Sequence, residues 1–213
     1  MDEVFPKVVF ALFDVIPMRD TVISTWVMMA LILGVVYIIR RSMPNALEMF
    51  IDFVSDTVSD VLGRPAGPFL PFLGAIILFL LVANNLGLLP LLATPTKDIN
   101  TPLAMALIVF FAVHYYGIRD KGVLGYFKSL ATPIFMLPLE LIGQLSRTMS
   151  LTLRLFGNVI SSEFIVAVIF SLVQPIAPLP MMALGAVSGV LQAYIFTILA
   201  SSYIASALGD SRS

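Results

Sequence analysis

Residues 138–172, PLELIGQLSRTMSLTLRLFGNVISSEFIVAVIFSL, decide the fold, because they form one long, mainly apolar stretch with no proline after the first residue. As a continuous α-helix they would extend about 52 Å at 1.5 Å per residue. The hydrocarbon core of a bilayer is only about 30 Å thick. A continuous helix would therefore have to lean about 55 degrees from the membrane normal, whereas spanning helices usually tilt by about 20 degrees.

A second apolar stretch follows, so we predict a long, steeply inclined helical hairpin built from residues 133–173 and 179–208. The alternative is a break near Gly143 or Gly157 that divides the first of these helices into two shorter ones. The turn of the hairpin is expected at a cluster of proline and polar residues, namely Gln174, Pro175, Pro178 and Pro180.

The earlier part of the chain contains three more apolar runs, which we interpret as spanning helices over residues 21–39, 69–92 and 101–118. Between the first two, residues 44–62 repeat apolar side chains at helical spacing opposite Glu48, Asp52, Asp56 and Asp60. This pattern indicates an amphipathic helix that lies on the membrane surface or packs on other subunits. The predicted fold is therefore all-α, a single integral membrane domain over residues 1–213 with about five transmembrane helices.

Composition excludes several classes of protein. The chain is 59% hydrophobic and 12% charged, with a mean hydropathy of +1.01, whereas soluble domains carry about 25% charged residues. It has no cysteine and one histidine, His114, so we expect neither a metal site nor a cofactor. The net charge of -1 argues against a nucleic-acid partner. The first twenty residues lack the basic and compact apolar regions of a cleaved signal peptide, so we expect them to remain in the working protein.

The distribution of lysine and arginine predicts the orientation, since cytoplasmic connections are enriched in both. With the N-terminus outside and the C-terminus in the cytoplasm, the cytoplasmic side carries Arg40, Arg41, Arg64, Arg119, Lys121, Lys128 and Arg212. The outer side then carries Lys7, Arg19 and Lys97. We expect a bacterial plasma (inner) membrane as the location.

Four charged residues lie within the long apolar stretch, namely Glu140, Arg147, Arg154 and Glu163. A charge at the bilayer centre costs at least about 2.5 to 3.5 kcal/mol, so each of them needs a structural or functional reason. Spacings of seven place Glu140, Arg147 and Arg154 nearly on one helical face, and nine residues separate Glu163 from Arg154 and turn it to the opposite face. A structural ion pair, or snorkelling to the interface, is the alternative for the arginines.

Other polar residues lie near these charges. Asn158 follows Arg154 by one helical turn and extends its polar face. In the last apolar stretch, small and polar residues form a stripe that includes Gly185, Ser188, Gln192 and Tyr203. Ordinary helix packing through small residues is the alternative reading for Gly185 and Ser188. For Gln192 we expect a hydrogen bond to the arginine region.

Two motifs within these stretches resemble a known family. The run Ser150-Leu-Thr-Leu-Arg-Leu-Phe-Gly-Asn158, followed by Glu163, resembles the signature of subunit a of the F-type ATP synthase, the membrane-sector stator subunit of the ATPase subunit 6 family. The segment Leu191-Gln-Ala-Tyr-Ile-Phe196, with Tyr203, resembles the last helix of that subunit. Weaker similarity extends over Asn85–Pro90, Asp98–Asn100, Glu140 and Arg147.

The resemblance implies that Arg154 is the essential arginine that faces a rotating ring of c subunits and deprotonates their membrane carboxylates. Two offset half-channels would lead ions to and from this ring, so that ion flow drives rotation and ATP synthesis. The residues expected along these paths are Glu163, Asn158, Gln192, Tyr203, Glu140, Arg147, Ser188 and Asn100. Implied partners are the c-subunit ring, b-type peripheral stalk subunits and the lipid bilayer. The chain contains no GxxxxGK[ST] loop, so we expect no direct nucleotide binding and no enzymatic activity of the chain alone.

One position departs from this pattern, because some bacterial relatives place a histidine where this chain has Gly185. Water or other polar groups must therefore take the place of that histidine as the partner of Glu163. The main alternative function is a stand-alone ion channel or secondary transporter, which would use the intramembrane charges as its own ion site and conduct ions by itself. The choice between protons and sodium ions stays open at this point.

Overall fold

The computed structural model describes residues 8–12, 16–88, 94–130, 137–172 and 178–209. Five helices in this part of the chain are long and apolar enough to cross a membrane. They are α1 (Asp20–Ser42), α3 (Leu70–Asn85, extended by the short helix η1, Leu86–Leu88), α4 (Asn100–Lys121), α6 (Leu137–Leu172) and α7 (Pro178–Leu208). The predicted all-α class and number of spanning helices are confirmed, and the chain is an integral membrane protein.

Five further elements complete the described structure. Helix α2 (Pro44–Leu62) follows α1 directly, the short helix η2 (Pro95–Lys97) precedes α4, and α5 (Val123–Leu130) follows it. Strands β1 (Val8–Leu12) and β2 (Ile16–Arg19) pair antiparallel before α1. The sequence pattern predicted neither this two-stranded ribbon nor α5. Both are too short to give a clear periodic signal.

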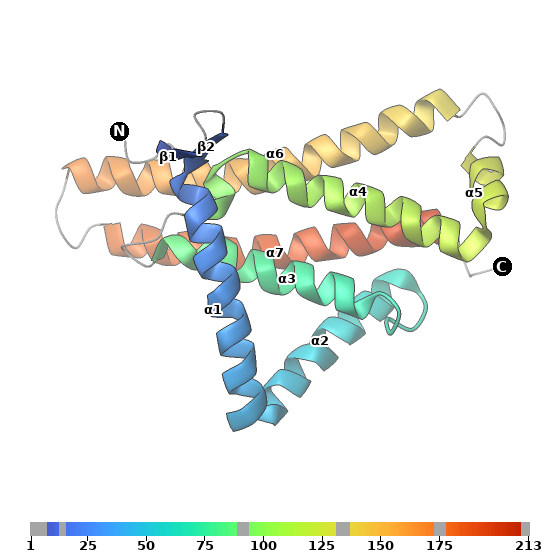
Figure 1. Ribbon diagram of the computed structural model, residues 1–213, viewed down its shortest axis with the longest axis horizontal. Coiled ribbons are helices and arrows are strands. Elements are labelled where there is room, and N and C mark those ends of the chain that lie inside the picture. The colour runs from blue at the N-terminus through green and yellow to red at the C-terminus, as the bar shows by residue number, and fades with distance from the viewer. Residues whose placement is uncertain (1–7, 13–15, 89–93, 131–136, 173–177, 210–213) are drawn as a thin grey trace.

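Helix α6 is continuous over 36 residues, with Gly143 and Gly157 both inside it. The alternative of a break at either glycine is therefore wrong. Helix α7 begins at Pro178, a position where proline is favoured because its missing N–H would have no partner in the first turn. Figure 1 shows α6 and α7 side by side and antiparallel, as the predicted hairpin requires. Gln174 and Pro175 lie outside the described residues.

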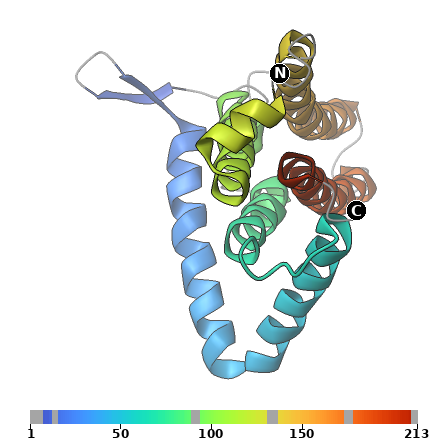
Figure 2. The same ribbon diagram turned by 90° about the vertical axis from the view of Figure 1, so that its right-hand side faces the viewer.

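The long helices do not all run in the same direction. Helices α3, α4, α6 and α7 lie along the long axis of the molecule, whereas α1 crosses them steeply (Figures 1 and 2). Helices of such different direction cannot all stand upright in a bilayer. At least one group of them is strongly inclined.

The core lies where α7 packs against α2, α3 and α4. Its fully buried side chains include Phe196 and Ile204 of α7, Leu73 and Leu80 of α3, and Val58 of α2. Small residues of α7 such as Ala193 and Ala200 are also buried, which lets neighbouring backbones approach closely.

The amphipathic prediction for residues 44–62 is confirmed by α2. Val54, Val58 and Leu62 of α2 are buried. The four acidic side chains are exposed, namely Glu48, Asp52, Asp56 and Asp60. The helix ends at Gly63, whose φ of 66° is the left-handed conformation that favours glycine after a helix.

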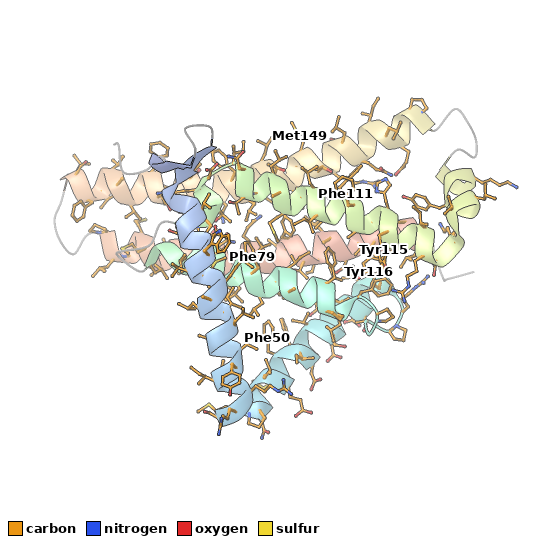
Figure 3. All side chains as sticks on the ribbon, viewed as in Figure 1. Phe50, Phe79, Phe111, Tyr115, Tyr116 and Met149 are labelled. Carbon is orange, nitrogen blue, oxygen red and sulfur yellow. The ribbon has the colours of Figure 1, made fainter. Side chains whose placement is uncertain are left out.

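Large apolar side chains also cover much of the outer surface. Phe111 of α4 is 66% exposed and Met149 of α6 is 51% exposed, and both are marked among the side chains in Figure 3. A water-soluble protein would hide many such residues, whereas a lipid environment accommodates them.

Candidate functional site

Glu140 and Arg147 of α6 meet Tyr203 of α7 in a group that we call the Arg147 cluster, with Gln144 as its fourth member. Arg147 Nη1 lies 3.6 Å from Glu140 Oε1, and the Arg147 guanidinium lies over the Tyr203 ring, 5.5 Å from its centroid. Gln144 Nε2 donates a hydrogen bond to Glu140 Oε1 at 3.4 Å. The seven-residue spacing of Glu140 and Arg147 thus does place them on a common face.

Asn158 and Ser188 form the second cross-link between α6 and α7. Ser188 Oγ donates a hydrogen bond to Asn158 Oδ1 at 2.8 Å, and Asn158 Nδ2 donates to the Ser188 carbonyl oxygen at 3.4 Å. Both polar atoms of the amide are therefore used across the interface. Gly185, one turn earlier on α7, faces Ser162 of α6, since a Cβ built there would lie 3.6 Å from Ser162 Cβ.

Glu163 is partly buried on α6, beside the end of α3. Its Oε1 lies 3.7 Å from the point that a Cβ on Gly87 would occupy. The same point collides with the Thr94 hydroxyl, so only glycine fits at this position without a shift. Glu163 thus lies at the place where η1 approaches the segment that leads into α4.

That segment carries a set of buried polar residues, which we call the η2 cluster and which consists of Thr94, Thr96, Lys97 and Asp98. Lys97 is 6% exposed and Asp98 is 4% exposed. Asp98 Oδ1 accepts hydrogen bonds from the Asn100 backbone N–H at 3.2 Å and from Asn100 Nδ2 at 2.9 Å. Segment η2 packs against α1, α3, α4 and α6, which explains its burial.

Asn84 of α3 connects the η2 cluster to α7. Thr96 Oγ1 donates a hydrogen bond to Asn84 Oδ1 at 3.0 Å, and Asn84 Nδ2 donates to the Gly189 carbonyl oxygen at 3.2 Å. A Cβ on Gly189 would lie 3.1 Å from Asn84 Cβ, so the absent side chain permits this approach.

Arg154 lies between these groups and is exposed on α6. Among the described residues, no acceptor or carboxylate binds its guanidinium. Gln192 is 6% exposed, and its Nε2 has no hydrogen-bond partner in the described part of the chain. Among the described residues, Gln192 forms no hydrogen bond to the arginine region, although one was expected.

Several polar residues of these groups were not among the predicted site residues. The prediction of orientation used Lys97 only as a positive charge in an outer connection. Asn84 and Thr96 carried no signal that distinguished them from other polar residues near a helix end. Gln144 was overlooked, although its spacing of four from Glu140 places it on the same helical face.

Taken together, the long apolar helices and the polar groups buried between them define a polytopic membrane protein with charged sites inside its spanning region. A sequence profile described as ATP synthase A chain matches residues 22–205. The chain belongs to this ATP synthase A chain family.

Similar proteins cover nearly the whole chain. ATP synthase subunit a 2 of Bradyrhizobium sp. (strain BTAi1 / ATCC BAA-1182) is 44% identical over 93% of this chain and 94% of its own length. ATP synthase subunit a 2 of Picosynechococcus sp. (strain ATCC 27264 / PCC 7002 / PR-6) is 40% identical over 94% of this chain and 91% of its own length. ATP synthase subunit a of Moorella thermoacetica (strain ATCC 39073 / JCM 9320) is 34% identical over 96% and 97%, respectively.

Proposed function

We propose that this chain is the ion-translocating a subunit of an F-type ATP synthase. In this proposal Arg154 faces a ring of c subunits, b-type peripheral stalk subunits hold the chain in place, and the complex lies in a bacterial inner membrane with the N-terminus of the chain outside. The observation that carries the proposal is the position of Arg154, exposed on α6 between two separate polar groups.

The separation of these groups is large on the scale of the membrane. Glu140 and Glu163 are 23 residues apart on one continuous helix, which corresponds to about 35 Å. Arg154 lies between them, about 21 Å along the helix from Glu140 and about 14 Å from Glu163. The polar group around Glu140 can thus open toward one side of the membrane and the group around Glu163 toward the other, while neither group extends across the membrane.

The chemistry of Arg154 fits the position between two paths. A guanidinium stays protonated at any physiological pH, so it provides a fixed positive charge. A fixed cation favours the ionised form of a carboxylate that passes beside it, and it repels a cation that would cross directly from one path to the other. Ions must then travel with the ring. The Arg147 cluster serves the cytoplasmic path, and Glu163 with Asn158, Ser188 and the η2 cluster serves the outer path.

Replacing Arg154 with alanine should abolish ATP-driven ion pumping, because ring carboxylates would no longer release their protons at the interface. The measurement is acidification of liposomes that contain the purified complex, with ATP hydrolysis as the check of assembly. Arg119→Ala, which removes an exposed arginine in the last turn of α4, is the matched control and should pump normally. Full pumping by Arg154→Ala would refute the proposal.

Two further measurements address the ion and the alternative function. Stimulation of pumping by added sodium would identify sodium as the transported ion, and its absence would support protons. The purified chain alone in liposomes should conduct little, since the ring carries the ions between the two paths. Rapid flux through the isolated chain would favour a stand-alone channel.

A further inference from the structure

A small cavity lies between α4, α6 and α7 beside the Arg147 cluster. Its volume is about 20 Å³, and its polar lining consists of His114, Gln144, Arg147, Thr148 and Tyr203. Apolar side chains of α4 and α6 complete the wall. A volume of about 10 to 15 Å³ is enough for one water molecule if two or more polar partners are present.

Gln144 provides one acceptor that needs a donor. The side chain is 7% exposed, and its Oε1 is buried with no hydrogen-bond partner among the described residues. Its Nε2 is already used in the bond to Glu140, and Thr148 Oγ1 donates to the Gln144 backbone oxygen at 3.0 Å. A buried acceptor without a donor destabilises the fold, so a water in the cavity would remove that cost.

His114 provides a second acceptor with a defined tautomer. Its Nδ1 lies 2.8 Å from the Phe110 carbonyl oxygen. A carbonyl oxygen only accepts hydrogen bonds, so Nδ1 carries a hydrogen and Nε2 is the nitrogen at which the ring gains or loses a proton. Contacts with the rings of Phe110, at 4.5 Å between centroids, and of Tyr126, at 5.9 Å, fix the orientation of the imidazole.

The charged and titratable groups around His114 come from every packed element. Arg147 of α6 and Tyr203 of α7 line the same cavity, and Glu140 holds Arg147 in place. From α5, Tyr126 lies against the His114 ring, and burial, followed by the charge of Glu140, raises the pKa of its hydroxyl. Tyr126 is therefore neutral at physiological pH.

We propose that the cavity holds one water molecule that donates to Gln144 Oε1 and to His114 Nε2, and that His114 exchanges protons through this water in the cytoplasmic path. When a proton reaches this water, Nε2 accepts it to give the imidazolium and then returns it to the water, which passes it on along the path, so that the imidazole is unchanged after each ion. This proposal rests on the proposed function. It assigns a role to His114, which was not among the site residues expected from the sequence.

The test uses the complete complex in liposomes and the variant His114→Gln, which keeps a hydrogen-bonding side chain but cannot titrate. ATP-driven pumping is measured across about pH 6 to 8, the range in which histidine changes charge. The parent complex should show a component of the rate that depends on pH in this range, and the variant should lose that component. Phe111→Leu, which changes an exposed residue of the same helix outside the cavity, should keep it.

Two results would overturn the proposal. One is an unchanged pH profile in His114→Gln, and the other is an empty cavity in a structure of the complex that resolves ordered waters. A purely structural role of His114 would lower assembly and leave the shape of the profile unchanged. The result for Arg154→Ala is independent, because normal pumping by that variant would refute the proposed function, whereas an unchanged His114→Gln profile would refute only the role of His114.

Discussion

At the scale of single residues, Asn158 and Ser188 illustrate how a polar pair is placed inside an apolar interface. Each side chain satisfies the other across α6 and α7, at 2.8 Å for the shorter bond. A polar side chain left without a partner in hydrocarbon would carry a larger cost than one in water. The pair therefore fixes the register of the two helices at the level just beyond Arg154.

Replacing Ser188 with alanine should lower the free energy of unfolding by about 0.5 to 1.5 kcal/mol, since the hydroxyl donor to Asn158 is lost. Hydrogen bonds between membrane helices average about 0.6 kcal/mol, so a value near the lower end is expected. Denaturant titration of the solubilised chain, in a double-mutant cycle with Asn158→Ala, measures the coupling. Ser206→Ala is the control, because that exposed hydroxyl donates only within α7. Equal losses in both serine variants would contradict the assignment.

At the scale of elements, the length of α6 was predictable and the position of α5 was not. A mainly apolar run of 35 residues without an internal proline leaves few alternatives to one long helix. The eight residues of α5 carry too little periodicity to distinguish a helix from a loop. Its place is set by Tyr126, which is 1% exposed and packs where α4 has Gly117 instead of a side chain. Such a match is visible only in three dimensions.

The variant Gly117→Ala tests this packing. The new Cβ would collide with Tyr126 Cε2 and lie 2.9 and 3.3 Å from two further ring atoms. Because an aromatic ring cannot deform, we expect a loss of about 1 to 3 kcal/mol in the free energy of unfolding. Gly143→Ala, on α6, meets no atom within 4 Å and should be neutral or stabilise by up to about 1 kcal/mol. Thermal unfolding followed by circular dichroism compares the two, and equal stability would show that α5 does not pack as described.

The candidate site shows the same division between what sequence patterns indicate and what only packing decides. The spacing of Glu140 and Arg147 correctly indicated a common face. The sequence did not indicate which helix the stripe of α7 would contact, and in the structure Gly185 and Ser188 lie against α6. Lys97 could not be placed in this way, because a lysine in a connection is usually exposed. Its burial depends on four elements that surround η2, and these come from distant parts of the chain.

At the scale of the whole molecule, the connections on one side of the spanning helices are tied together. Arg64, between α2 and α3, pairs with Asp120 near the end of α4 at 3.2 Å. The last turns of α1 and α4 are also basic, with Arg40 and Arg41 in the former and Arg119 and Lys121 in the latter. Basic residues thus end two of the spanning helices, and the predicted orientation expects both of these ends on the cytoplasmic side.

Cysteine labelling in intact membranes checks the predicted orientation, and the natural absence of cysteine makes the background clean. Leu124→Cys replaces a residue of α5 that is 88% exposed, and Ile99→Cys replaces one just before α4 that is 45% exposed. A membrane-impermeant thiol reagent added outside should label position 99 only, whereas position 124 should react after the cytoplasmic face is opened. The reverse pattern would invert the topology.

The unbroken course of α6 also has a mechanical consequence. A helix without a kink is stiff, because bending it sharply would require backbone hydrogen bonds to break. The two cross-links to α7 bracket Arg154, with the Arg147 contact to Tyr203 seven residues before it and the Asn158 bond to Ser188 four residues after it. Both contacts therefore resist a force that acts on α6 at Arg154. The Arg154 backbone keeps its position when a neighbouring protein surface moves past it.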